Sequence, residues 1–389
     1  MSSSTPPVTS PTTPRSDVVI VGAGIIGLAH AFEALSNGLS VTVLDRDRRP
    51  VGASVRNFGH CCISAQDGEL LALAQRSRPG WLRAAEAAGI WAAEAGTLVV
   101  ARSATEAAVL EELHAERGGD AVRLRSAAQT AEALGRAAGE GGDLVGGAVL
   151  PADLRVDPRE AAPGLARWVA EQPRGRILWG TAVTGVESGT VHTTRGPVHG
   201  DRILVCVGHD LDYLLPDVAE DHGIQRCRLT MARAAAPEGF RTDSAVLTAT
   251  SMLRYDAFTA RPSAARLREE VLGHSAELLE IGANVMFTRQ PDGTLLIGDS
   301  HHYDATTPPF VDERTYELLI DAVARVLGAP RLRILERWQG VYASSPRGPL
   351  LVRDLAQGVR AISVTSGIGM TLSFGLAAAT FDGTLAATA

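Results

Sequence analysis

Residues 17–45 of this 389-residue chain are DVVIVGAGIIGLAHAFEALSNGLSVTVLD, and this stretch decides the fold. Asp17–Val21 predicts a short apolar strand, and the glycine-rich turn GAGIIG follows it at once. Leu28–Asn37 predicts a helix, and Ser40–Leu44 predicts a second strand that leads directly into Asp45. A strand, a glycine-rich turn, a helix, a strand and an acid in this order are typical of a dinucleotide-binding βαβ unit.

Each glycine of the turn has a physical role in such a site. Gly22 permits the tight turn, Gly24 lets the backbone approach a pyrophosphate, and Gly27 lets the helix pack closely on the strand. The phosphates then lie against free N–H groups at the positive end of the helix. Asp45 follows Gly27 by 18 residues, near the spacing at which a carboxylate binds both ribose hydroxyls. FAD or NAD is therefore favoured over NADP.

Composition and charge exclude several other classes of protein. The chain is long enough for two domains, and 45% of its residues are hydrophobic. With a net charge of −7 and no basic stripe, nucleic acid is not an expected partner. No apolar run reaches about 18 residues, so we expect no transmembrane helix. All 37 Lys and Arg residues are arginine, which excludes lysine Schiff bases, PLP chemistry and any lysine role in oxygen activation.

The N-terminal residues and the cysteines give an expectation of the cellular location. Residues 1–16 are mostly Ser, Thr and Pro without the pattern of a secretory signal, so we expect a disordered tail. Cys61, Cys62, Cys206 and Cys227 lack metal-ligand spacing. Free thiols, no bound metal and a cytoplasmic location are the expectations.

Hydrophobic periodicity gives a coarse map of the rest of the chain. Residues 118–147 predict helical stretches between glycines, and 202–208 predict a buried strand ending in glycine. The pattern over 224–300 is mostly strand, including a strand at 251–255, and Asp292-Gly293 predicts a hairpin. An amphipathic helix is predicted at 312–327.

Four segments, taken in order, resemble the flavin-dependent D-amino-acid oxidase family, which includes glycine and sarcosine oxidases. They are VVIVGAGIIG with Asp45, the loop RRPVGASVRNFG, the strand ILVCVGHD, and the pair WQGVYASSPRGPLLV and VTSGIGMTLSFGLA. The resemblance extends from about Asp17 to about Ala379. It implies an α/β fold with a Rossmann-type FAD-binding domain and a mixed β-sheet substrate domain. The implied boundaries are 17–85, 148–210 and 335–389 for the first, and 86–147 and 211–334 for the second.

Three phrases resemble most closely a subgroup of this family that is tied by gene neighbourhood to phosphonate breakdown. They are GASVRNFG, LRY at 253–255, and RQPDGTLLIGDSHHY at 289–303. The role proposed for that subgroup is oxidative deamination of an aminophosphonate. The chain departs from it at His60-Cys61-Cys62, where an apolar stretch is expected after Phe58-Gly59.

The motif and the resemblance together imply non-covalent FAD. A helix N-terminus in this family stabilises the negative charge that reduced flavin gains, and the glycine-rich stretch at 366–371 predicts that helix. A thioether from Cys61 to flavin is the alternative, as some relatives are linked covalently. The implied cofactor-binding residues are Gly22, Gly24, Ile25, Ile26, Gly27, Asp45, Arg46, Ala53, Ser54, Arg56, Asn57, Val183, Gly208, Gly340, Gly367, Ile368, Gly369, Met370 and Thr371.

An anionic substrate needs an arginine, because the planar guanidinium binds two oxygens at once. Arg254, with Tyr255 beside it, and Arg347 in a Ser-Pro-Arg-Gly loop are the first candidates; a solvated surface arginine is the alternative for each. His302 is the candidate catalytic histidine. The other candidate pocket residues are His60, His301 and Tyr303. For any single histidine, a structural hydrogen bond is the alternative role.

The predicted function is FAD-dependent oxidation of a small amine or amino acid, with an aminophosphonate as the finer suggestion. A hydride passes from the carbon bearing the amine to the flavin, and the imine then hydrolyses. The electron acceptor, O2 or another, and the oligomeric state are open. The alternatives are a 2-hydroxy-acid oxidoreductase, a non-catalytic FAD-binding subunit, and an NAD-dependent enzyme.

Overall fold

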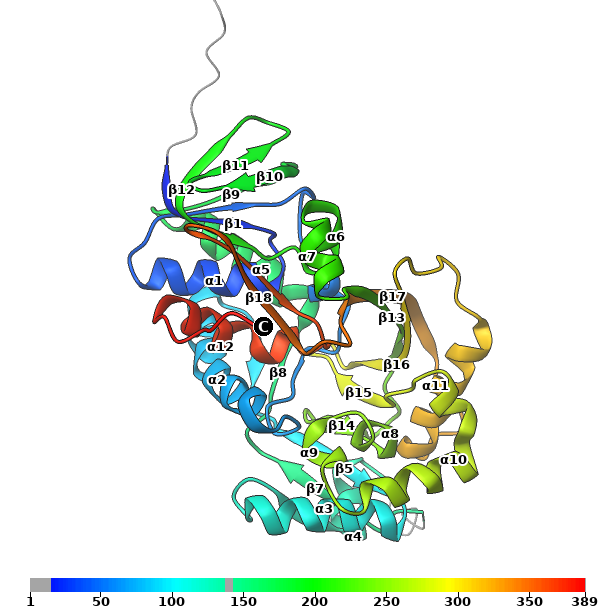
Figure 1. The fold of residues 1–389 in the computed structure, drawn as a ribbon. Coiled ribbons are helices and arrows are strands. Elements are labelled where there is room, and N and C mark those ends of the chain that lie inside the picture. The colour runs from blue at the N-terminus through cyan, green and yellow to red at the C-terminus, as the bar shows by residue number, and fades with distance from the viewer. Residues whose placement is uncertain (1–14, 137–142, 389) are drawn as a thin grey trace, which may run out of the picture.

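The computed structural model describes residues 15–136 and 143–388, and Figure 1 shows two large sheets with helices packed around them. The predicted tail, residues 1–16, lies outside the described residues except for Arg15 and Ser16. Ser16 is the first residue of strand β1, so the strand begins inside the predicted tail. No helix in the described part of the chain is long and apolar enough to cross a membrane.

The first large sheet has a parallel centre, in the order β9-β2-β1-β12-β19. Antiparallel β10 and β11 extend it beside β12, and β18 pairs with β19. Nearly all residues of β1 and β2 are buried, as expected for Val- and Ile-rich parallel strands covered on both faces. The strands are β1 (Ser16–Val21), β2 (Val41–Leu44), β9 (Gly175–Leu178), β10 (Val183–Glu187), β11 (Thr190–Thr193), β12 (Val198–Val205), β18 (Leu350–Ala356) and β19 (Val359–Val364).

Four helices pack against one another beside this sheet, and Figure 1 shows the C-terminal helix α12 in red between α1 and α2. The ring of Phe374 on α12 packs edge-on against Phe32 and Trp81, with ring centroids 5.7 and 4.9 Å apart. This packing fixes the start of α12 close to the glycine-rich turn that precedes α1. The helices are α1 (Ile25–Ser36), α2 (Gly68–Ala88), α5 (Pro158–Glu171) and α12 (Gly369–Phe381).

The second large sheet is mixed, in the order β17-β13-β16-β15-β14-β5-β7-β6, with only β14 and β5 parallel. Its β17 falls inside the predicted boundaries of the first domain but pairs with β13 here. The strands are β5 (Thr97–Ala101), β6 (Arg123–Ser126), β7 (Gly146–Leu150), β13 (Gln225–Ala235), β14 (Ala245–Leu247), β15 (Met286–Arg289), β16 (Thr294–Asp304) and β17 (Ile334–Ser344).

Smaller elements connect the two large sheets and surround the second one. A three-stranded sheet pairs β3 (His60–Cys61) and β4 (Ala92–Ala93) with β8 (Leu154–Val156). The remaining helices are α3 (Ala104–Arg117), α4 (Ala127–Ala133), α6 (Leu211–Leu214), α7 (Pro216–Asp221), α8 (Ala249–Met252), α9 (Asp256–Thr259), α10 (Ala264–Glu280) and α11 (Glu313–Leu327), with 3-10 turns η1 (Ala53–Val55) and η2 (Gly208–Asp210).

Several predicted elements are confirmed. The hairpin at Asp292-Gly293 joins β15 to β16, and the Asp292 side chain accepts hydrogen bonds from the backbone N–H and the hydroxyl of Thr294. The helix predicted at 312–327 is α11, which begins after the N-cap Asp312 and ends at Gly328 with φ of +65°. The α/β architecture with a parallel and a mixed sheet is therefore as predicted.

Two predictions of secondary structure are wrong, and a third is correct only in part. The predicted strand at 251–255 is the end of helix α8 and the turn after it, because Thr248 and Ser251 form a capping box that starts a helix. The mostly-strand region also contains the long helix α10. The stretch at 118–147 contains the predicted helix, α4, but also strand β6, which pairs with β7; residues 137–142 of it lie outside the described part.

Candidate active site

A cavity of about 510 Å³ opens where β1 and β2 end. This is the edge at which parallel α/β sheets bind ligands. Gly27 does not line it, and Ile368 and Thr371 line the adjoining cavity instead. The other predicted cofactor residues all line it: Gly22, Gly24, Ile25, Ile26, Asp45, Arg46, Ala53, Ser54, Arg56, Asn57, Val183, Gly208, Gly340, Gly367, Gly369 and Met370.

The glycines of the turn are required by close backbone contacts. Gly22 has a φ of +106°, and a Cβ there would lie 2.5 Å from the carbonyl oxygen of Cys206. A Cβ on Gly27 would lie only 2.0 Å from the carbonyl oxygen of Gly22. Gly27 therefore does not touch a ligand; it lets the first turn of α1 pack on the loop that does. Gly24 is the N-cap of α1.

Asp45 and Ser54 hold the glycine-rich turn in place. The Asp45 carboxylate accepts a hydrogen bond of 2.7 Å from the backbone N–H of Ala23 and one of 2.8 Å from that of Asp47. Ser54 Oγ accepts one of 2.8 Å from the N–H of Ile25. Burial raises the pKa of Asp45, against the effect of these two N–H groups. Each carboxylate oxygen has two acceptor sites, so capacity for ribose hydroxyls remains.

A second cavity of about 60 Å³ adjoins the first. The two share five lining residues: Asn57, Leu229, Tyr342, Gly367 and Met370. The predicted catalytic residues Arg254 and Tyr255 line the smaller cavity. The start of α12 lies at the junction, since Gly369 lines the larger cavity and Thr371 the smaller one. The positive end of a 13-residue helix therefore points at the place where the two cavities meet.

Arg254 lies in the turn between α8 and α9 and contacts two tyrosines. Its Nη2 donates to Tyr342 Oη at 2.8 Å, and its Nη1 donates to Tyr303 Oη at 3.4 Å. Burial lowers the pKa of Arg254, but the tyrosine hydroxyls and Asp299 outweigh this and raise its pKa above the ordinary value. The guanidinium is therefore charged, and three of its five N–H donors are not used by these two hydrogen bonds.

Residues that line the smaller cavity carry three buried polar atoms without a hydrogen-bond partner. They are His60 Nδ1, Asn284 Oδ1 and Asp299 Oδ1. Buried polar atoms in proteins are nearly always paired, so a cluster of exceptions around one cavity indicates a place where a polar ligand binds. Burial raises the pKa of Asp299 to about 7, and the charge on Arg254 opposes the shift.

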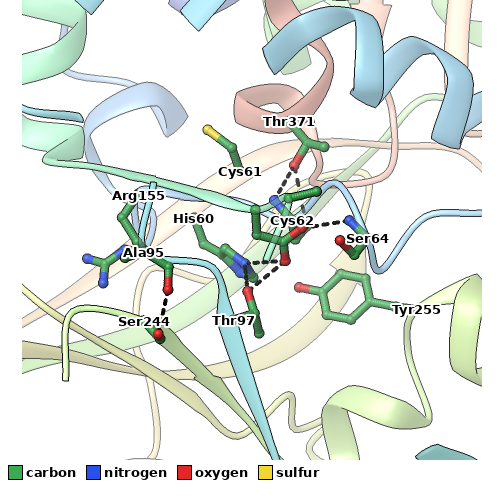
Figure 2. A network of polar contacts seen from close by, with 12 residues as sticks. His60, Cys61, Cys62, Ser64, Ala95, Thr97, Arg155, Ser244, Tyr255 and Thr371 are labelled. Carbon is green, nitrogen blue, oxygen red and sulfur yellow. Dashed lines mark hydrogen bonds and ion pairs between the residues drawn. The ribbon is translucent and has the colours of Figure 1, made fainter. Parts of the chain in front are cut away.

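Behind this cavity, His60 belongs to a buried polar network that Figure 2 shows from close by. Its Nε2 lies 2.7 Å from Thr97 Oγ1 and 3.2 Å from Asp153 Oδ2. Thr97 donates to the same carboxylate at 2.6 Å, and the N–H of Ser64 donates to its other oxygen at 2.7 Å. These contacts hold the His60 ring against the cavity. The segment His60-Cys61-Cys62, where the phosphonate-linked subgroup is expected to have an apolar stretch, therefore places a polar ring at the cavity.

The two neighbouring cysteines have different surroundings. Cys62 lines the smaller cavity, and its backbone N–H donates to Thr371 Oγ1 at 3.1 Å. Cys61 lines neither cavity, and its Sγ contacts the carbonyl oxygen of Met370 at 3.7 Å. Burial raises the pKa of Cys62 to about 11 and that of Cys61 well above the ordinary value. Both side chains are therefore thiols rather than reactive thiolates.

Two predicted catalytic residues are not brought together with the others. Arg347 is exposed in the turn between β17 and β18 and lines neither cavity. His302 is exposed on β16, whereas its neighbour His301 is buried and lines the smaller cavity. Successive residues of a strand face opposite sides, so only one of the two histidines can reach the site. His301 Nδ1 lies 2.8 Å from the carbonyl oxygen of Gly282.

The sequence analysis missed Tyr342, Asn284 and Asp299. A usable signal was present for the two polar residues, because each lies at or near a predicted apolar strand, where an unpaired polar side chain is costly and usually functional. Nothing comparable marked Tyr342, whose place is set by the pairing of β17 with β13. No group of three or more His, Cys, Asp or Glu in the described residues could hold a metal ion.

Comparison with known proteins identifies the family. The model of the family described as "DAO: FAD dependent oxidoreductase" matches residues 17–382. The chain belongs to this family. The predicted family, the fold class and the dependence on FAD are thereby confirmed, and the glycine-rich turn, the helix start and the 510 Å³ cavity fit that cofactor. No curated protein matches the chain.

Solved structures share the fold of this DAO-family chain over 94–97% of its length. Glycine oxidase from Geobacillus kaustophilus has a TM-score of 0.74 at 19% identity, covering 97% of each chain. Iminodiacetate oxidase from Chelativorans sp. BNC1 has a TM-score of 0.73 at 18% identity, covering 96% of this chain and 97% of the other. L-alpha-glycerophosphate oxidase from Mycoplasma pneumoniae, with FAD bound, has a TM-score of 0.70 at 18% identity, covering 94% of each.

Proposed function

We propose that this FAD-dependent oxidoreductase oxidises a small amine or amino acid that carries an anionic group. The observation that carries the proposal is the charged Arg254 guanidinium, with unused donors, in a small polar cavity that adjoins the cofactor cavity. A planar guanidinium binds a carboxylate or phosphonate through two oxygens. Of the two arginines that the sequence suggested, we propose Arg254 as the anion-binding residue.

The size of the cavity supports a small substrate. About 60 Å³ is room for roughly four water molecules, which matches a molecule of a few heavy atoms. Tyr342 and Tyr303 each accept one hydrogen bond from the guanidinium, which leaves three N–H donors for a ligand. Leu229 and Met286 add apolar wall that excludes water around the bound substrate.

The chemistry is divided between the cofactor and the chain. Bound FAD supplies the acceptor for the hydride that leaves the substrate carbon. Arg254 orients the substrate, and the N–H groups at the start of α12 stabilise negative charge at the junction of the cavities. The imine product then hydrolyses in water. We also propose that FAD is held without a covalent bond and that the chain has the two predicted domains, with β17 assigned to the second one because it pairs with β13.

The names of the structural neighbours support an anionic substrate. Glycine and iminodiacetate are carboxylated amines, and glycerophosphate is an anionic alcohol. At these identities the likeness shows the fold alone, so the amine is a proposal. An aminophosphonate is the more specific substrate that we propose. The resemblance of GASVRNFG and RQPDGTLLIGDSHHY to the phosphonate-linked subgroup supports it.

The test is reduction of the purified flavoprotein without oxygen, followed by its absorbance near ~450 nm. The panel is 2-aminoethylphosphonate, its N-methyl and 1-hydroxy forms, glycine, sarcosine, iminodiacetate, D-alanine and D-lactate. We expect an amine to bleach the flavin and to release ammonia, methylamine or, from iminodiacetate, glycine on turnover. Bleaching by D-lactate alone would instead support hydroxy-acid oxidation. A yellow protein that nothing reduces would support a non-catalytic subunit. Readmitting air then tells whether O2 is the acceptor.

A further inference from the structure

The smaller cavity contains a carboxyl group that the proposed anion site does not use. Asp299, on β16, is only 3% exposed, and its Oδ1 has no hydrogen-bond partner. It lines the same cavity as Arg254. The two residues, both in the described part, form no ion pair within 4.0 Å. The carboxyl group of Asp299 and the guanidinium of Arg254 therefore share one small cavity without forming a direct ion pair.

The position of Asp299 is fixed by its backbone. Its N–H donates to the carbonyl oxygen of Asn284 at 2.9 Å, and the N–H of Asn284 donates back to Asp299 at 2.8 Å. His301 Nε2 lies 3.8 Å from Asp299 Oδ2. Burial, with the charge on Arg254, holds the pKa of His301 well below its ordinary value, so this ring is neutral. It does not supply a counter-charge for the carboxylate.

We infer that Asp299 receives the cationic amine of a zwitterionic substrate whose anionic group is bound by Arg254. This inference rests on the proposed function and narrows it to substrates that carry both charges. Asp299 also takes a proton: one N–H bond of the ammonium breaks and one O–H bond forms on the carboxylate. The electron pair of the broken bond stays on nitrogen, which leaves the neutral amine that oxidation of the adjacent C–H requires.

The surroundings of Asp299 suit a group that gains and loses a proton near neutrality. Arg254 and Tyr255 face it from the turn between α8 and α9, Cys227 from β13 and His301 from its own strand. Of these, only Arg254 carries a charge near neutrality, because burial raises the pKa of Tyr255 and Cys227 and lowers that of His301. A general base works best when its pKa is near the working pH, and the pKa of Asp299, about 7, satisfies this condition.

The test compares two ligands of nearly equal shape, 2-aminoisobutyrate and pivalate, by calorimetry on the holoenzyme. Neither has a hydrogen on the carbon next to the carboxylate, so binding is measured without oxidation. We expect the wild-type protein to prefer the zwitterion by about 10- to 100-fold, as a paired charge in a buried site implies. Asp299→Asn should lose this preference and keep its affinity for pivalate within about threefold. Asp304→Asn, exposed on the same strand, is the matched control.

A measurement on the wild-type protein alone covers the case in which the variant fails to fold. The preference for 2-aminoisobutyrate should fall as the pH is lowered from 8.5 to 5.5, because protonated Asp299 no longer attracts a cation. An unchanged preference, in Asp299→Asn or across this range, would refute the role of Asp299. The proposed function would still stand if amines reduce the wild-type flavin, and would fail separately if none does.

Discussion

The two adjoining cavities are built in opposite ways. The larger one is shaped largely by backbone: the turn at 22–26, the loop at 52–57 and the start of α12 each bring glycine, alanine or serine residues to the space. The smaller one is shaped by side chains from β13, β15, β16, β17 and the turn between α8 and α9. A backbone-built site depends on spacing within a short stretch, whereas a side-chain-built site depends on strand register and packing between distant segments.

Gly27→Ala should have the largest effect, and only on the backbone-built cavity. A methyl group there would lie 2.0 Å from the carbonyl oxygen of Gly22, so helix α1 and the turn would have to separate. We expect FAD affinity to fall more than about 100-fold and the free energy of unfolding to fall by about 3 kcal/mol. Flavin absorbance per chain and titration of the apoprotein with FAD measure the first effect; denaturant unfolding measures the second.

Gly273→Ala is the matched control for this substitution. Gly273 lies within α10, has no side-chain or backbone atom within 4 Å of an added Cβ, and has no positive φ. Alanine there should stabilise the protein by about 0.5–1 kcal/mol and leave FAD binding unchanged. Full flavin occupancy in Gly27→Ala would show that the turn tolerates the methyl group and that its glycine spacing is not what holds the cofactor.

Arg254→Gln should have a smaller effect, confined to the side-chain-built cavity. It removes the charge that binds the anionic group, so substrate affinity should fall about 30- to 100-fold, or about 2–3 kcal/mol. FAD affinity should not change, because Arg254 does not line the larger cavity. Substrate concentration dependence of flavin reduction and FAD titration give the two values. Arg268→Gln, exposed on α10, is the control; an equal loss in both variants would place the anion site elsewhere.

The difference between the backbone-built and the side-chain-built cavity explains how much of the site could be predicted from the sequence. The turn around Gly22 and Gly24, with Asp45 at its spacing, could be predicted in full because the information lies in one stretch. Arg254 was predicted to lie in a strand; it lies in a turn, yet it does reach the cavity. The pattern of neighbouring residues could not predict this turn, because the capping of α8 by Thr248 and Ser251 competes with strand formation at 251–255.

The histidines at 301 and 302 mark the limit of prediction more sharply. Both lie on β16 in the structure, and the alternation of side chains along that strand decides which of them is buried. That choice depends on the register of β16 against β13, where His301 lies opposite Leu229 and a bulge follows. Register is set by packing over the whole sheet. The same packing brings Asn284, which lies just before β15, and Tyr342 on β17 to the cavity from segments far apart in the sequence.

Cys61→Ala should have the smallest effect, and it tests whether any part of the cofactor is held by a covalent bond. Cys61 lines neither cavity, is fully buried, and its Sγ contacts the carbonyl oxygen of Met370. A thioether needs a thiolate that can reach the flavin, and burial raises the pKa of this thiol well above the ordinary value.

We therefore expect acid precipitation to release all the flavin from both wild-type protein and Cys61→Ala, with full flavin occupancy before the acid. The variant should lose only about 1 kcal/mol of stability from the missing sulfur atom. Mass spectrometry of the denatured wild-type chain supplies the decisive comparison. A chain that carries the added mass of FAD in the wild type, and loses it in Cys61→Ala, would show that the backbone cradle needs a covalent bond. FAD binding could then not be assigned to the larger cavity alone, because the segment at 60–62 would bind the cofactor and also line the smaller cavity.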